Sequence, residues 1–134
     1  MNNPGSITRG ANTQQIVPER WPAFLADFTR QNRGAHATLE ILHAGDVERI
    51  VAEDRPFEGI SADVKDRERA VWITFTDTPS DHFTHGVQGV TSLWVTPTTP
   101  EAGPALEVET SDGAHTLLFF TSPLAYALPP GAKS

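Results

Sequence analysis

The sequence predicts an α+β protein that is mostly β: a strongly bent or barrel-like antiparallel sheet of about six to seven strands, with one N-terminal helix packed on it. One segment has the apolar spacing of a helix. The segments that follow alternate with a period of two, and two of them are apolar on both faces. With 134 residues, 38 % of them apolar, the chain can bury a sizeable core within one domain.

The helix is expected at about residues 22–32. Its apolar stripe follows the i, i+3, i+4, i+7 pattern and consists of Trp21, Phe24, Leu25 and Phe28. Because Pro22 lacks an amide hydrogen and crowds the carbonyl four residues back, residues 18–21 should form a separate turn before the helix. Gly34 is suited to the left-handed residue that ends a helix.

The strands are expected after the helix, where the apolar period changes to two. The seven segments with this pattern are residues 35–43, 47–53, 58–64, 71–76, 92–96, 105–110 and 115–120. The last two are joined by Ser111, Asp112 and Gly113, a strong hairpin signal because glycine supplies the positive φ of a tight turn. The proline-rich residues 97–104 predict a loop.

Two of the strands, residues 71–76 and 115–120, carry large apolar side chains on both faces. Burying one such side chain stabilises a protein by roughly 1.5–3 kcal/mol, so both faces need cover. We therefore expect the sheet to curl around one core while the helix stripe covers its other face.

The chain divides into three expected parts: a disordered leader at residues 1–15, a single α+β domain at 16–121 and a Pro-rich tail at 122–134. The leader has no apolar run of the kind found in secretory signals, and no window reaches the roughly 18 apolar residues of a membrane helix. We therefore expect a cytoplasmic protein. The chain has no cysteine, which excludes disulfides and thiolate chemistry.

The charge pattern argues against two classes of partner. The formal net charge is −7, and residues 70–132 contain no lysine or arginine but six acidic residues. Their negative field repels phosphate backbones and anionic lipid, so we expect no nucleic acid and no membrane as partners.

Three patches of the sequence resemble a known family: IVPERWPAFLADFTRQNRG, FEGISADVKD and ALEVETSDGAHTLLFF. The chain resembles, over roughly residues 16–121, a family of short bacterial proteins known only as an uncharacterised domain of unknown function. The resemblance implies a single recurring domain. It implies no reaction, ligand or catalytic residue.

The segment most typical of a metal site contains Asp81, His82 and His85. Two imidazoles and a carboxylate suit Zn²⁺ or another divalent ion. In a strand, however, residues at i and i+3 point to opposite faces, so the three converge only in a helical turn. The alternative is a polar loop in which Asp81 caps the next turn.

Other segments with catalytic potential are weaker. Ser61 lies in a sequence that lacks the second glycine of a nucleophile elbow. Residues 86–89 lack the lysine and the helix of a phosphate loop. Glu107 and Glu109 share one face of a strand, but the apolar residues between and before them predict an ordinary strand with its polar side exposed.

Trp72 and Trp94 lie on the faces opposite the aliphatic rows of their strands. If the helix covers only one of them, the other is an exposed aromatic side chain in polar surroundings, which is typical of a contact with a protein or a flat ligand. The alternative is that both pack beneath the helix or the tail.

The sequence therefore predicts a small soluble non-enzymatic domain that binds a protein partner or itself, with no catalytic residue and no cofactor. One alternative is a metal-assisted or acid–base enzyme that uses Asp81, His82 and His85. A third is a purely structural accessory domain.

Overall fold

The part of the chain that the structure describes begins with a short strand, a turn and a helix, and seven further strands follow. The structure, a computed structural model, describes residues 12–65, 68–100 and 102–121. Within these ranges the elements are β1 (Gln14–Ile16), the 3-10 turn η1 (Pro18–Arg20), α1 (Trp21–Asn32), β2 (His36–His43), β3 (Asp46–Asp63), β4 (Ala70–Thr78), β5 (Asp81–Gln88), β6 (Val90–Thr96), β7 (Ala105–Thr110) and β8 (Ala114–Phe120). Most of the predicted leader and the whole predicted tail lie outside the described residues. Gln14 and Gln15, placed in that leader, belong to β1.

Helix α1 agrees with its prediction to within one residue, and η1 forms the separate turn expected before it. Gly34 follows the helix with a φ of 91°, the left-handed conformation that glycine adopts without steric cost. The hairpin between β7 and β8 is also confirmed, because Gly113 has a φ of 90°.

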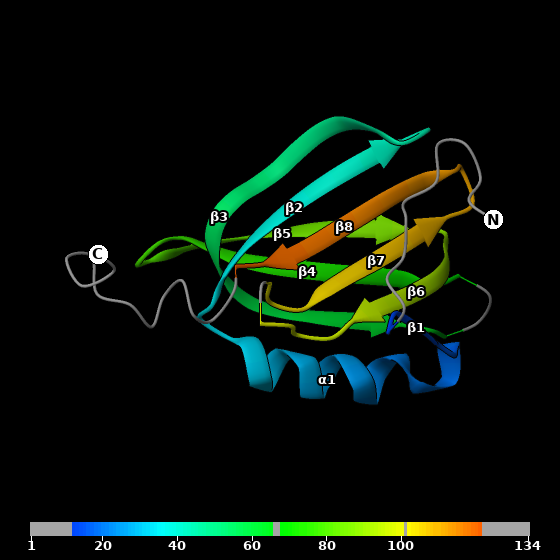
Figure 1. The fold of residues 1–134 in the computed structure, drawn as a ribbon, viewed down its shortest axis with the longest axis horizontal. Coiled ribbons are helices and arrows are strands. Elements are labelled where there is room, and N and C mark those ends of the chain that lie inside the picture. The colour runs from blue at the N-terminus through cyan, green and yellow to red at the C-terminus, as the bar shows by residue number, and fades with distance from the viewer. Residues whose placement is uncertain (1–11, 66–67, 101, 122–134) are drawn as a thin grey trace.

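All strand pairs are antiparallel, and they form one sheet in the order β1-β6-β7-β8-β2-β3-β4-β5. The predicted fold class is confirmed. The sheet is strongly bent, so that β2, β8, β7 and β6 lie in front of β4 and β5 (Figure 1). It does not close into a barrel, because β1 and β5 are the two ends of the strand order.

The bend follows β3, a single strand of 18 residues. The sequence predicts separate strands at 47–53 and 58–64, and this prediction is wrong. The first part of β3 pairs with β2 as far as Pro56, and the part from Phe57 onward pairs with β4. Register shifts accompany the change, and Asp54 adopts a φ of 53°. Bulges of this kind turn a strand sharply without ending it.

Helix α1 and the residues that follow it cover the edge of β3 that β2 leaves unpaired. After the helix, the Phe57 amide donates to the Ala35 carbonyl at 2.8 Å, and the Gly34 amide donates to the Phe57 carbonyl at 2.7 Å. Within the helix, the Thr29 hydroxyl accepts from the Ile60 amide at 3.0 Å and donates to the Ile60 carbonyl at 3.1 Å. These bonds satisfy backbone groups that a free sheet edge would expose.

The helix stripe and the inward rows of the sheet form one core. Trp21, Leu25 and Phe28 are buried together with residues of every strand from β2 to β8. The Phe28 ring contacts the Phe120 ring with centroids 5.6 Å apart. The prediction that the helix covers the other face is therefore wrong: the helix closes the open side of a curled sheet. The outward residues Trp72, Trp94, Leu117 and Phe119 are not part of this core.

Candidate functional site

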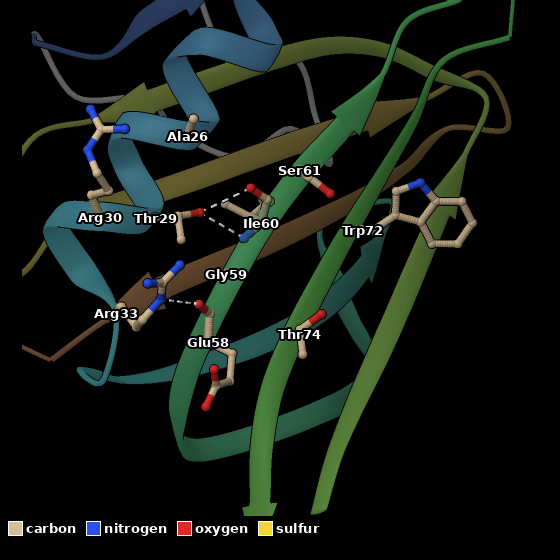
Figure 2. A pocket seen from close by; sticks show the side chains of 10 residues that line it. All are labelled: Ala26, Thr29, Arg30, Arg33, Glu58, Gly59, Ile60, Ser61, Trp72 and Thr74. Carbon is tan, nitrogen blue, oxygen red and sulfur yellow. Dashed lines mark hydrogen bonds between the residues drawn. The ribbon is translucent and has the colours of Figure 1, made fainter.

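A groove of about 510 Å³ runs between the outer side of α1 and strands β3 and β4. Ten residues line it (Figure 2): Ala26, Thr29, Arg30, Arg33, Glu58, Gly59, Ile60, Ser61, Trp72 and Thr74. It combines an aromatic ring, two guanidinium groups and three hydroxyls, so it can hold an anionic group beside an apolar one.

Trp72 lies at one end of the groove (Figure 2). It stands on the outer face of β4 because Val71, Ile73 and Phe75 turn into the core, and it is 39 % exposed. Gly86 lies opposite Trp72 in register on β5. A Cβ atom at Gly86 would come within 2.4 Å of the indole ring. The glycine therefore lets the ring lie directly against the backbone of β5.

Two arginines lie at the other end of the groove: Arg30 in the last turn of α1, and Arg33, the residue that follows the helix (Figure 2). Ala26, Thr29, Arg30 and Arg33 follow the i, i+3, i+4, i+7 spacing, which places them on one side of the helix. Arg33 donates from Nε to the Glu58 carbonyl at 3.1 Å, and Arg30 forms an ion pair with Asp27. Both guanidinium groups are exposed, so they remain accessible to an anion.

Gly59 forms part of the groove at the point where β3 faces the helix. A Cβ at Gly59 would lie 3.2 Å from the methyl group of Thr29, so the absence of a side chain allows the close approach of α1. Ser61 and Thr74 present hydroxyls between the arginines and Trp72 (Figure 2). Ser61 lies within β3 and not at a strand-to-helix turn, so it lacks the setting of a hydrolase nucleophile.

Asp81, His82 and His85 are not brought together. They belong to β5, where the sequence predicts a loop or a helical turn, and that local prediction is wrong. Phe83, His85 and Val87 form the less exposed row of the strand, while His82 lies on the exposed row opposite Thr76. The Nδ1 atom of His82 is 3.7 Å from Oε2 of Glu58. The two histidines therefore lie on opposite faces of the sheet.

The pKa of His85 lies below its ordinary value of 6.5 because burial removes water from the imidazolium and because the positive charge of Arg49 opposes protonation. The unfolded chain thus takes up a proton more readily than the folded protein. We expect stability to be full above about pH 7 and to fall as the pH drops through 6.5 toward the lower folded-state pKa. Urea unfolding between about pH 7.5 and 5.5 should show a smaller loss for His85→Gln than for wild type.

The control for this pH dependence is His82→Gln, on the exposed row of the same strand. It should keep the wild-type loss of stability on acidification. Equal pH profiles for wild type and His85→Gln would contradict the assignment.

The structure corrects the sequence interpretation of Glu107. Glu109 and Glu107 do share one face of β7, but Glu107 is only 5 % exposed. It lies between two large neighbours, since Trp94 on β6 and Leu117 on β8 are its partners in register. Trp94 is half-buried, and its Nε1 donates to Oε1 of Glu109 at 3.0 Å.

Sequence reasoning missed His115, which joins this pair of carboxylates. Its Nδ1 lies 2.5 Å from Oε2 of Glu107 and 3.5 Å from Oε2 of Glu109. The hairpin signal at residues 111–113 could have predicted the position of His115. A three-residue connection between two strands places Glu109 directly opposite His115.

No helix among the described residues is long and apolar enough to cross a membrane.

Comparison with known proteins gives a family but no activity. The searches found no similar sequence among the curated proteins and no similar fold among the solved structures. A family model does match residues 12–129, nearly the whole chain, which confirms the predicted resemblance. The chain belongs to the family described as a family of unknown function, DUF5335.

Proposed function

We propose that the protein is a non-enzymatic binding module that holds an acidic segment of a protein partner in the groove between α1 and β3–β4. The observation that carries this proposal is Trp72, which is 39 % exposed at one end of a groove whose other end holds Arg30 and Arg33. Tryptophan and arginine are the residues that most often dominate the energy of protein–protein contacts.

Charge supports an acidic occupant. The chain as a whole has a net charge of −7, whereas the groove brings two arginines and one glutamate together. The Glu58 carboxylate already accepts a hydrogen bond from the Thr76 hydroxyl. A partner carboxylate near Arg30 and Arg33 would form charge-assisted hydrogen bonds, and an adjacent apolar side chain would cover the Trp72 ring.

A phage-displayed library of random peptides tests this proposal. Wild-type protein should enrich sequences that combine acidic and apolar residues. A synthetic peptide of the enriched sequence should bind Trp72→Ala at least about tenfold more weakly, as measured by fluorescence polarisation. Arg33→Ala should weaken binding and reduce its dependence on salt.

Two further variants sharpen this test. Ile50→Ala removes a 50 % exposed apolar side chain that does not line the groove, and it should bind the peptide like wild type. Gly86→Ala keeps Trp72 but forces its ring to move, so it should also weaken binding. A peptide that binds wild type and Trp72→Ala equally would refute the groove as the site.

Self-association is the other outcome of this set of measurements. If light scattering shows that the wild type is a dimer and that Trp72→Ala is a monomer, the occupant of the groove is a second copy of the chain and not a separate partner. A monomer at high concentration, together with peptide binding, favours the separate partner.

A further inference from the structure

A second polar cluster lies on β7 and β8, on residues that the groove does not use. Glu107 and Glu109 are two apart on β7, and His115 on β8 lies opposite Glu109 in register. One ligand atom from each residue can be chosen so that all three lie within 4.8 Å of one another. Two strands of a rigid sheet therefore hold one imidazole nitrogen and two carboxylate oxygens close together.

Neighbouring side chains orient these groups. The Oε1 atom of Glu109 accepts hydrogen bonds from the Ser92 hydroxyl and from Trp94 Nε1, both on the adjacent strand β6. The second oxygen, Oε2, is the one that lies 3.5 Å from His115. In metal sites, outer hydrogen bonds of this kind fix the orientation of a ligating carboxylate.

The surroundings favour a cation. Glu40 on β2 lies opposite Leu117, which places it on the same face of the sheet as Glu107. The chain from residue 70 to residue 132 contributes no lysine or arginine. The local potential from these strands is therefore negative, as a divalent cation requires.

We propose that Glu107, Glu109 and His115 bind a divalent transition-metal ion, with Zn²⁺ as the ion that this donor set suits best. Imidazole nitrogen favours Zn²⁺ over Mg²⁺ and Ca²⁺, and carboxylate oxygens complete a site of three protein ligands with a fourth position for water.

The fit needs only a small adjustment. His115 Nδ1 and Glu107 Oε2 are 2.5 Å apart, the separation of a strong hydrogen bond. Two ligands on one tetrahedral Zn²⁺ are roughly 3.3 Å apart, given bonds of about 2.0–2.1 Å. The ion would thus replace the proton between these atoms while the side chains move apart. The displaced proton goes to solvent.

Zn²⁺ titration of the full chain tests the proposal. After chelator treatment, isothermal calorimetry should show one Zn²⁺ per chain, and Zn²⁺ should raise the melting temperature. Mg²⁺ should produce neither effect at the same concentration. His115→Gln and Glu109→Gln should each weaken Zn²⁺ binding by at least about tenfold. Because Trp94 donates to Glu109, the titration should also change tryptophan fluorescence, and Trp94→Phe should remove that change.

His82→Gln is the matched control, since it removes a more exposed histidine from β5 and should bind Zn²⁺ like wild type. Circular dichroism of each variant without metal establishes that it is folded. No stoichiometric Zn²⁺ binding by the wild type, or equal binding by folded His115→Gln and wild type, would overturn the proposal. Either of these results would leave the proposed binding of a peptide in the groove unaffected, because the two sites share no residue.

Discussion

Trp21→Ala should lower the free energy of unfolding by about 3–5 kcal/mol, the largest effect we expect from one substitution. Trp21 is fully buried at the start of α1 and belongs to the single core. Its Nε1 also donates to the Ile16 carbonyl at 2.7 Å and so holds β1 against the helix. The alanine variant loses the buried ring, leaves a cavity and frees β1. Urea denaturation monitored by circular dichroism measures the change.

Trp21→Phe is the control that separates these contributions. It keeps an aromatic ring in the core and loses the hydrogen bond to Ile16, so it should cost clearly less than the alanine variant. A loss of less than about 1 kcal/mol for Trp21→Ala would contradict a core that includes the helix, because a helix lying loosely on the sheet would tolerate the change.

Thr29→Val should lower the free energy of unfolding by about 2–4 kcal/mol even though valine has nearly the same shape. The Thr29 hydroxyl is the shared partner of the amide and the carbonyl of Ile60, and the residue is only 8 % exposed. Valine leaves both backbone groups of Ile60 unpaired at a place that α1 shields from water. Thermal and urea unfolding measure the loss.

The matched variant at this position is Thr29→Ser, which keeps the hydroxyl and removes the methyl group next to Gly59. It should cost about 1 kcal/mol or less. If the serine and valine variants were equally destabilised, packing of the methyl group would be the main contribution, and the helix would not act as the hydrogen-bonding cover of the β3 edge.

Several elements were predictable because their signals are local. The stripe from Trp21 to Phe28, the turn before it and the glycine after it all act within a few residues, and α1 and Gly34 match them. Strands β4, β7 and β8 are rich in strand-forming residues, and they were predicted close to their bounds. Trp72 was predicted to lie on the face opposite Val71, Ile73 and Phe75, since a period of two assigns each side chain to a face.

Other elements depend on contacts between distant residues. Strand β5 interrupts its alternation with His85 and Gly86, and it forms because β4 offers a partner along its whole length. Residues 53–57 contain Asp54 and Pro56, which are typical of a turn, yet pairing with β2 and then with β4 carries β3 through them. Strand propensity depends on neighbours more than helix propensity does.

The candidate sites divide in the same way. The face on which Trp72 lies follows from its own strand, but its exposure depends on where the helix packs, and Arg30 and Arg33 line the same groove only because α1 lies along the edge of β3. Glu107 and Glu109 share a face by local geometry, whereas the contribution of His115 depends on the register of β7 and β8.

The sequence by itself determined an acidic, mostly β domain with one amphipathic helix, a family membership and the placement of Trp72 and Trp94 on the faces opposite the aliphatic rows of their strands. Only the tertiary structure decided that the helix closes the side of the curled sheet, that Glu107 is buried, and that His82 and His85 lie apart. The physical reason is that periodicity assigns a side chain to a face of its own element. Which two faces meet depends on the bend, the register and the edges of the sheet, and these arise from pairings across the whole chain.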